Sequence, residues 1–462
     1  MALKRDDALG GRVDKLVDEV IRQMAAGVYR RGQRLPSVRH GAVLHGVSKN
    51  TMAEAYDKLV VRGVVAARPG SGFYATGEWP VAPMPTTPHV AEAIGIVSLL
   101  REQLEQHYEV RAGDGRPPAS WMEGSEIRRF IRNSRKGEIE YGYGSPWGLA
   151  GLRSWLRMAL AERQIPVAED GIALTHGINH GQDLIIRHLL EPGDTVFVDS
   201  PGYYPLFGKL RLANIVVVPI RRGPNGPDLA DLAEKLERHR PQIYFTQSQA
   251  HNPTGSGLSP SQAFTILQMA ELHDFRVVED DIFADLLPPT LPRLAAFSKP
   301  ERVIYLGSFS KTLSAGLRCG YVAAAPDIVR RIVDIKMLTT VATSAHVEQL
   351  VLDLIEGGHY RRHLRRLRVR IDEASKDAIA ALASIGLRVT PPSIPGFYLW
   401  VPLPEGTDED GLVHRAAARD IFIAPSSVFH PDSSEMSPGM RINVAYGADP
   451  KLIEFLHEEL GR

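Results

Sequence analysis

Apolar positions near the start of the chain recur at helical spacing and predict three helices. The apolar face of the first helix consists of Val13, Leu16, Val17, Val20, Ile21 and Met24. Gly27 ends this helix, Ser37 starts a short second one, and Ser48 is the N-cap of a third, which Gly63 closes. The buried stripe of the third helix consists of Met52, Ala55, Tyr56 and Leu59.

Two short runs follow, around the turn Pro69-Gly70-Ser71-Gly72, and predict a β-hairpin. Three helices and a hairpin make a winged helix-turn-helix, which we expect to span residues 1–77. Residues 78–91 contain four prolines and few large apolar side chains, so they predict a semi-extended linker.

A different pattern begins after the linker and predicts an α/β domain over residues 92–462. Short β-rich runs such as DTVFVDSP, QIYFTQS, RVVEDDI and RVIYLGSFS alternate with helical stretches such as SPSQAFTILQMAELHDF. This alternation indicates a mostly parallel sheet. From about Pro326, two long helical patterns lead to GFYLWVPLP and GMRINVAYG, which predict a smaller C-terminal α+β part.

Composition and charge narrow the class of protein. The chain has 462 residues, more than one compact core usually holds, and its 44% hydrophobic and 23% charged residues are typical of globular proteins. Its formal net charge is zero, yet residues 30–68 carry eight Lys or Arg against two Asp or Glu. This surplus predicts a module that binds a polyanion.

Cysteine content and hydropathy indicate the compartment. The single cysteine, Cys319, excludes an intrachain disulfide and fits a reducing environment. No run approaches the ~20 apolar residues of a membrane span, and no signal-peptide core opens the chain. We therefore expect a cytoplasmic protein with no membrane partner.

The head places polar and basic residues where a DNA-reading helix needs them. The SKNT run stands at the first turn of the third helix, ahead of its apolar stripe. The residues expected to face the major groove are Ser48, Lys49, Asn50 and Thr51. Arg39 on the second helix can reach a phosphate, and the turn of the hairpin can approach the minor groove. Pattern and charge alone fit an ordinary three-helix subdomain with a solvated basic face equally well.

The sequence motifs of the head favour DNA binding. GQRLPSVR, GVSKNTMAEAYDKLVVRG and ARPGSGFY closely resemble the GntR-type winged-helix domain from about Val13 to Ala75. The resemblance implies that the DNA-contact positions are Arg39, Lys49, Asn50, Thr51 and Gly70. The family usually has leucine-alanine where this chain has Gly41-Ala42, and Gly41 costs its helix ~1 kcal/mol against alanine.

A lysine in a run of small residues is the candidate for covalent chemistry in the body. Lys311, within SFSKTLSAGLRCG, can form a Schiff base if its surroundings depress its pKa. Ser308, Ser310 and Arg318 beside it are suitable donors to a phosphate. A buried lysine paired with a carboxylate would look similar, so this run alone leaves both interpretations open.

Further polar residues are predicted at the carboxyl ends of strands, where open α/β sheets bind ligands. Asp280 could keep a pyridinium nitrogen protonated, Asn252 could donate to a phenolate oxygen, and Tyr203 offers a face for stacking. The stretch THGINHGQ, residues 175–182, is a glycine turn that opens a helix and suits a phosphate. Taken singly, Asp280 could cap a turn, Tyr203 could be core and the glycine turn could be a mere connection. Their joint occurrence in this order favours the chemical interpretation.

Longer motifs in the body resemble the fold-type I, class I aminotransferases from about Gly113 onward. They are YGYGSPWGLAGLR, EPGDTVFVDSPGYYP, HNPTG, VVEDDIFADL, SFSKTLSAGLRCGYV and GMRINVA. The resemblance implies that Lys311 carries pyridoxal phosphate as a Schiff base and that Arg441 holds an amino acid's α-carboxylate. It also implies that the cofactor contacts are Tyr203, Asn252, Asp280, Ser308, Ser310, Arg318 and the backbone at Ile178 and Asn179. Tyr143 would contact the phosphate from the partner subunit.

A GntR-type head, a proline-rich linker and an aminotransferase-like body together resemble the MocR-type transcription regulators. The resemblance implies a pyridoxal-phosphate-dependent regulator that binds promoter DNA as a domain-swapped, head-to-tail homodimer. Through Lys311 its body would sense pyridoxal phosphate itself or an amino acid or amine. A class I aminotransferase with an accessory DNA-binding head is the main alternative, because the expected catalytic residues are all present. A third reading is a DNA-binding protein whose body is a cofactor-free scaffold.

Two departures from the aminotransferase pattern bear on chemistry. Phe283 stands where relatives often have a tyrosine, and phenylalanine cannot donate to the ring oxygen. We therefore expect a raised pKa of the Schiff base and weak or residual transamination. Pro205 stands where some relatives use an arginine for an acidic substrate, which disfavours a dicarboxylate unless another loop supplies a cation.

Overall fold

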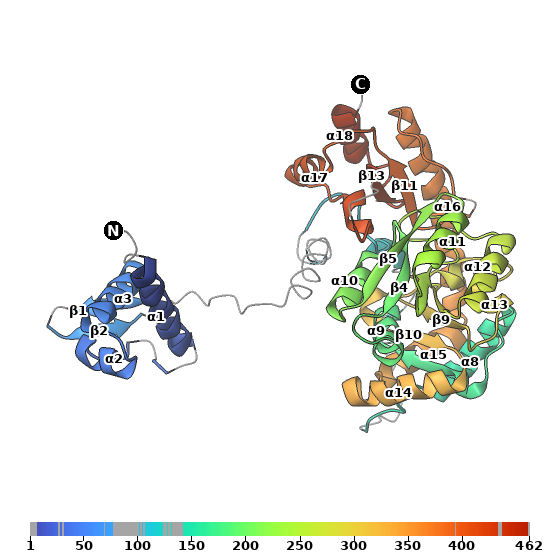
Figure 1. Cartoon of the computed structure of the whole chain (residues 1–462). Coiled ribbons are helices and arrows are strands. Elements are labelled where there is room, and N and C mark those ends of the chain that lie inside the picture. The colour runs from blue at the N-terminus through green and yellow to red at the C-terminus, as the bar shows by residue number, and fades with distance from the viewer. Residues whose placement is uncertain are drawn as a thin grey trace. The chain divides into compact units, whose positions relative to one another are not determined.

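The structure, a computed structural model, describes residues 7–25, 28–29, 32–68, 70–76, 101, 104, 107–122, 127, 131, 142–392, 394–432 and 437–460. The chain divides into two compact units, Met1–Pro88 and His89–Arg462 (Figure 1). The predicted linker at 78–91 lies outside the described residues, so its boundaries stay predictions. No helix among the described residues is long and apolar enough to cross a membrane.

The first unit is a winged helix-turn-helix, as predicted. Its elements are α1 (Asp7–Ala25), α2 (Val38–Leu44), α3 (Lys49–Val61), β1 (Val65–Arg68) and β2 (Gly72–Ala75), with β1 and β2 antiparallel. The predicted caps are present: Ser37 Oγ accepts from the His40 N–H, and Ser48 Oγ accepts from the Thr51 N–H. The apolar faces predicted for the first and third helices are buried in one core.

The glycine at position 41 has a packing reason. A Cβ placed on Gly41 would come within 3.0 Å of Met52 Cε, and Met52 is fully buried in the core of the head. The long side chain of Met52 therefore occupies the room that a larger residue on α2 would need.

The second unit is built on an eight-stranded sheet. Its strands are β3 (Ile172–Thr175), β4 (Thr195–Ser200), β5 (Val216–Gly223), β6 (Gly226–Pro227), β7 (Ile243–Thr246), β8 (Arg276–Asp280), β9 (Val303–Ser308) and β10 (Gly320–Ala323). The spatial order is β3-β10-β9-β8-β7-β4-β5-β6, with parallel pairing from β9 through β5 and antiparallel pairing of β10 with both neighbours. The predicted α/β class is confirmed.

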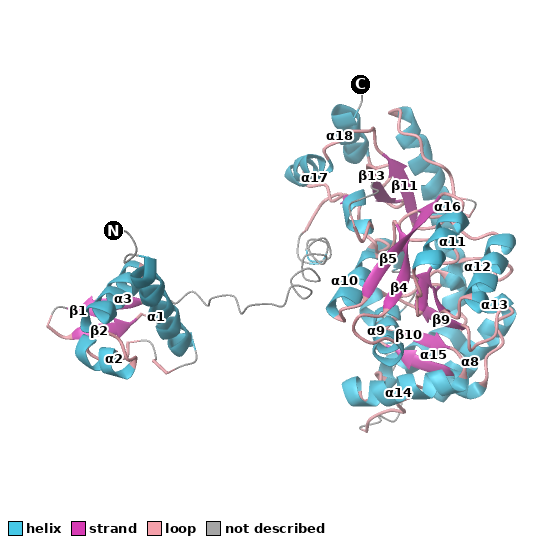
Figure 2. Ribbon diagram, viewed as in Figure 1, coloured by secondary structure: helices cyan, strands magenta, loops and turns pink. Residues whose placement is uncertain are grey.

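Helices cover both faces of this sheet (Figure 2). On one face pack α9 (Ile178–Leu189), α10 (Tyr204–Leu212) and α14 (Pro326–Thr340). On the other lie α8 (Ala150–Glu162), α11 (Leu229–Arg238), α12 (Pro260–Leu272), α13 (Leu294–Phe297), α15 (Ala345–Glu356) and the first half of α16 (His359–Ser384). Along β4 the side chains alternate between the two cores, with Phe197 in one and Val196 and Val198 in the other. Short helical pieces are α6 (Ala119–Met122), η3 (Glu169–Gly171), η4 (Ala284–Leu286) and η5 (Ala315–Leu317).

The smaller part has an antiparallel sheet of its own, in the order β11-β13-β12. Its elements are β11 (Tyr398–Pro402), α17 (Glu409–Ala418), β12 (Ala424–Pro425), η6 (Ser426–Phe429), β13 (Gly439–Asn443) and α18 (Pro450–Leu460). Helix α16 joins the two parts: Leu367 lies in a core of the large sheet and Leu382 in the core of the smaller part. Helices α14 and α15 pack on the large sheet. The start of the smaller part near Pro326 stays a prediction.

Candidate cofactor site

One pocket at the carboxyl ends of the strands brings together ten of the eleven body residues predicted to act. They are Ile178, Asn179, Tyr203, Asn252, Asp280, Ser308, Ser310, Lys311, Arg318 and Arg441. The eleventh, Tyr143, is 84% exposed on the loop before α8 and does not line this pocket.

The topology explains why residues so far apart in sequence meet here. Asp280 is the last residue of β8 and Ser308 the last of β9, while Asn252 lies in the loop after β7. Tyr203 follows β4, and α9 begins three residues after β3 ends. Parallel strands bring these carboxyl ends to one edge, where open α/β sheets bind ligands.

Lys311 has the properties of a nucleophilic amine. Loss of solvent around the side chain, reinforced by the positive charge of Arg441, lowers the pKa of Lys311 to about 8. Its Nζ donates a hydrogen bond to the carbonyl oxygen of Gly115. A lysine whose pKa is lowered in this way is partly unprotonated near neutral pH, as Schiff-base formation requires.

Among the described residues, no cation is a direct hydrogen-bond partner of the Asp280 carboxylate. Burial raises the pKa of Asp280 to about 7, against the opposing effect of hydrogen bonds from Gln247 and the Ile282 N–H, the latter 3.2 Å long. A protonated ring nitrogen beside it would favour the ionised carboxylate and restore an ordinary charge state.

The start of α9 forms a seat for an anion. Gly177 has φ +78°, and a Cβ there would come within 2.9 Å of Arg318 Nη2, so only glycine fits. Arg318 itself adopts the left-handed conformation, with φ +50°, and its Nη2 donates to the His176 carbonyl oxygen at 2.7 Å. Ser308 Oγ lies 3.0 Å from Ser310 Oγ on the same side of the pocket. The first N–H groups of a helix lack intrahelical acceptors, so this arrangement suits a phosphate.

Arg441 is a fully buried cation with a donor left over. It lies between the rings of Tyr398 and Phe429, at 4.8 and 5.0 Å from their centroids. Its Nη1 donates to Asn252 Oδ1 at 2.8 Å and its Nη2 to the Gly113 carbonyl at 2.6 Å, while Nε is buried without an acceptor among the described residues. An orphaned buried donor costs about 1–3 kcal/mol, which an anionic ligand would offset.

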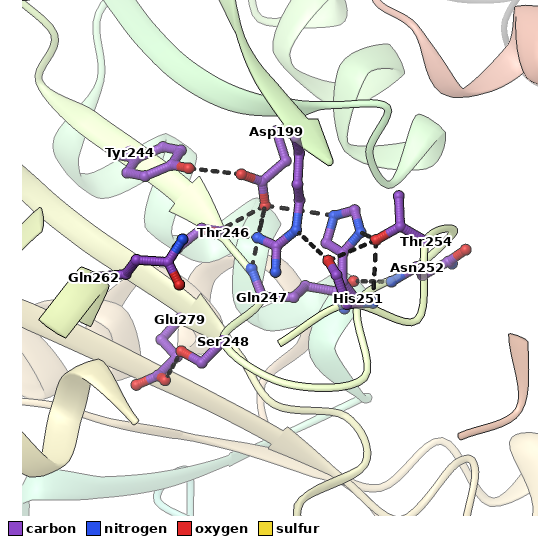
Figure 3. A network of polar contacts seen from close by, with 12 residues as sticks. Asp199, Tyr244, Thr246, Gln247, Ser248, His251, Asn252, Thr254, Gln262 and Glu279 are labelled. Atoms are coloured by element: carbon purple, nitrogen blue, oxygen red, sulfur yellow. Dashed lines mark hydrogen bonds and ion pairs between the residues drawn. The ribbon is translucent and has the colours of Figure 1, made fainter. Parts of the chain in front are cut away.

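A second layer of polar residues fixes the loop that carries Asn252 (Figure 3). Asp199, at the end of β4, accepts from Tyr244 Oη at 2.6 Å, Thr246 Oγ1 at 2.8 Å and Arg222 Nη1 at 3.0 Å. These donors and the neighbouring His251 lower the pKa of Asp199 to about 2 although burial opposes them. The buried carboxylate of Asp199 is therefore paired with several donors, one of them the cation Arg222.

The pocket contains residues that the sequence analysis did not single out. Gln247, Tyr398 and Arg116 line it, and Gln182 and Lys209 lie behind it. Pro205 disfavours an acidic substrate unless another loop supplies a cation. Arg116 is such a cation in this pocket, and its Nη2 lies 2.9 Å from a carboxylate oxygen of Asp114. The family motifs assign none of these residues a function. Only Gln182 could have been predicted from the sequence, because it follows the predicted phosphate turn by one helical turn.

In the head, every predicted DNA-contact residue is at the surface. Arg39 on α2, Lys49 and Asn50 at the start of α3, and Gly70 in the hairpin turn are exposed, and Thr51 is half-exposed. Gly70 has φ +73°, which the turn requires. Their contact with DNA remains a prediction.

Two family matches divide the chain as the fold does. Residues 12–75 match the bacterial regulatory proteins of the gntR family, and residues 126–458 match aminotransferase class I and II. The uncharacterized HTH-type transcriptional regulator YdcR of Escherichia coli is 27% identical over 454 residues, which is 94% of this chain and 95% of that protein.

Similarity to enzymes is confined to the body. The 2-aminoadipate transaminase of Thermus thermophilus is 32% identical over 310 residues, 65% of this chain and 76% of the enzyme. The crystal structure of LysN, the α-aminoadipate aminotransferase of Thermus thermophilus, superposes with a TM-score of 0.72 at 28% identity. That match covers 80% of this chain and 96% of LysN, which was crystallised with N-(5'-phosphopyridoxyl)-L-leucine.

Fold and site together define a DNA-binding regulator with an aminotransferase-like body. The chain belongs to the aminotransferase class I and II family, and its gntR-family head makes it a MocR-type transcriptional regulator. Its cofactor is pyridoxal phosphate, which the pocket residues fit in charge and in donor set. The predictions of family, fold class and cofactor are confirmed.

Phe283 generates a prediction about the bound cofactor. Its ring lines the pocket, is buried, and lies edge-on to Tyr398 with centroids 5.7 Å apart. Phe283→Tyr restores a donor to the anionic form, so we expect the pKa of the cofactor's visible absorption band to fall by about one unit. A pH titration of that band in both proteins measures the shift.

The matched control is Phe397→Tyr, which adds the same hydroxyl to the adjoining buried ring outside the pocket, 5.6 Å from Phe283. The control should titrate as the wild type does. Identical titrations of wild type and Phe283→Tyr would contradict the prediction.

Proposed function

We propose that the body senses an amino acid or amine through a Schiff base at Lys311 and that the head converts this state into promoter occupancy. The observation that carries the proposal is the convergence of ten predicted residues on one pocket, in a chain whose other unit is a winged helix-turn-helix. When bound, pyridoxal phosphate supplies an aldehyde for the amine and a ring that accepts electrons.

The residues of the pocket divide the work of holding cofactor and ligand. Lys311 supplies the amine, Asp280 holds a proton at the ring nitrogen, and Asn252 donates toward the ring oxygen. Tyr203 stacks on the ring. The phosphate is held by Ser308, Ser310, Arg318 and the backbone of Ile178 and Asn179. Arg441, which lines the pocket, receives the ligand's α-carboxylate.

The exposed position of Tyr143 supports a role across a subunit interface. Its loop is held by Lys336, whose Nζ donates to the Pro146 carbonyl at 2.8 Å, and by Glu348, which accepts from the Leu149 N–H at 2.7 Å. An aromatic residue that faces solvent can complete the pocket of a second chain. We therefore propose a homodimer, domain-swapped head to tail, in which Tyr143 reaches the partner's phosphate.

A metabolic aminotransferase remains the second candidate function. The complete set of pocket residues and the similarity to a transaminase favour it. Turnover of a panel of amino acids at ordinary enzyme rates would favour the enzyme, whereas slow turnover with ligand-dependent DNA binding favours the regulator.

Coupling between ligand and DNA requires that two arrangements of the protein differ in their affinity for the ligand. A ligand shifts DNA binding only as far as two arrangements of the protein bind it unequally. Helix α16 enters one core of the large sheet and the core of the smaller part, so it is suited to carry a change at the pocket into the smaller part.

DNA affinity measured with promoter fragments, with and without cofactor and amino acids, tests the proposal. Typical coupling predicts an affinity change of about 5- to 150-fold for the effective ligand. Lys311→Ala should abolish the change while leaving the DNA affinity of the unliganded protein intact. A DNA affinity that no amino acid or amine alters in the cofactor-loaded protein would sink the sensing proposal.

Lys49 at the exposed start of α3 is predicted to contact a DNA phosphate. Lys49→Ala should weaken binding to all sequences and reduce the slope of log affinity against log salt by about one. Lys58→Ala is the matched control, because Lys58 lies on the same helix with its Nζ 2.9 Å from Asp14. A slope that Lys49→Ala leaves unchanged would argue against a phosphate contact.

A further inference from the structure

A lysine of α10 lies behind the pocket in contact with two of its supports. Lys209 Nζ donates to Asn179 Oδ1 at 2.8 Å and to Gln182 Oε1 at 2.7 Å. Asn179 Oδ1 also accepts from Tyr203 Oη at 3.1 Å. One amine therefore joins the phosphate seat, the stacking ring and the glutamine that faces Asp280.

This lysine determines which way the amide of Gln182 points. A lysine amine donates and an amide has one accepting and one donating end, so the oxygen of Gln182 must face Lys209. The NH₂ group then faces Asp280, with Nε2 at 3.5 Å from Oδ2. Rotated by half a turn, the same amide would set its oxygen against the carboxylate and repel it.

Gln247 is oriented on the same principle from the other side of the pocket. Its Oε1 accepts from the Asn252 N–H at 2.7 Å, and its side chain donates to Asp280. With the Ile282 N–H, Asp280 thus faces three donors. Burial and the neighbouring Asp281 raise the pKa of Asp280, and the hydrogen bonds from Gln247 and Ile282 oppose them.

Charged groups around Lys209 shift its pKa in both directions. Burial is the largest effect and lowers the pKa of Lys209 to about 7, Asp183 and Asp280 oppose it, and Arg318 reinforces it. The orientation of Gln182 survives either charge state, because a neutral amine still has two N–H donors for the two amide oxygens.

We propose that Lys209 is a positioning residue that, through Gln182, keeps Asp280 an acceptor for the protonated ring nitrogen of pyridoxal phosphate. This role rests on the cofactor site proposed at Lys311. It does not require that the cofactor perform transamination or sensing.

The test uses the full-length protein loaded with pyridoxal phosphate labelled with ¹⁵N in the ring. Lys209→Met frees the amide of Gln182 and removes a positive charge near Asp280, so the pKa of Asp280 rises. We expect the ring ¹⁵N resonance at neutral pH to move toward that of an unprotonated pyridine and cofactor affinity to fall several-fold. Gln182→Leu should move the resonance in the same direction, and the double variant should add little to the change that Lys209→Met makes alone.

Matched variants separate this role from a structural one. Lys209→Arg keeps donors for both amides and should retain the wild-type resonance. Lys235→Met removes a lysine of α11 that lies outside the pocket and donates to Asp231 at 2.9 Å and to the Pro219 carbonyl at 2.6 Å. It should leave the resonance unchanged.

The outcomes distinguish this inference from the proposed function. A wild-type protein that shows no visible cofactor band overturns the cofactor site itself. A wild type with a protonated ring nitrogen, and Lys209→Met and Gln182→Leu proteins with the same resonance, overturn only the role of Lys209. If Lys209→Met fails to fold, the Gln182→Leu protein decides alone, because an unchanged ring ¹⁵N resonance in it overturns the role of Lys209.

Discussion

Burial of two opposite charges in one pocket is the constraint on which the rest of the body depends. It lowers the pKa of Lys311 to about 8 and raises that of Asp280 to about 7, so both groups are held near the point at which they change charge. Such shifts are typical of functional sites and are costly to maintain in an isolated fold. A ligand that brings an aldehyde to the amine and a cationic ring atom to the carboxylate satisfies both at once.

The surrounding polar residues are arranged so that the pKa values of Lys311 and Asp280 stay shifted. The carboxylate of Asp199 is saturated with donors and carries the loop of Asn252, while Arg441 is clamped between two rings with Nε unpaired. The Asp199 network holds its carboxylate with several donors, whereas Nε of Arg441 keeps unused hydrogen-bonding capacity. The pocket thus offers cations and hydroxyl donors to an anionic group and a carboxylate to a cationic ring atom.

Much of this site could be predicted from the sequence because its key residues stand at the ends of short apolar runs. Asp280 and Ser308 end their strands, and a parallel sheet brings strand ends together whatever lies between them. Lys209 and Gln247 could not be predicted, since their importance comes from tertiary contacts that no spacing encodes. The start of the smaller part near residue 326 stays a prediction, because the helical pattern of α14 does not reveal which core its apolar face joins. Gly41 became intelligible only with Met52 packed over it.

Mass spectrometry of the borohydride-reduced, digested protein tests the central claim most directly. The account predicts that, in protein saturated with pyridoxal phosphate, the peptide containing Lys311 gains the mass of a phosphopyridoxyl group and that no other lysine does. An unmodified Lys311 at saturation would contradict the account of sensing and leave only the DNA-binding head.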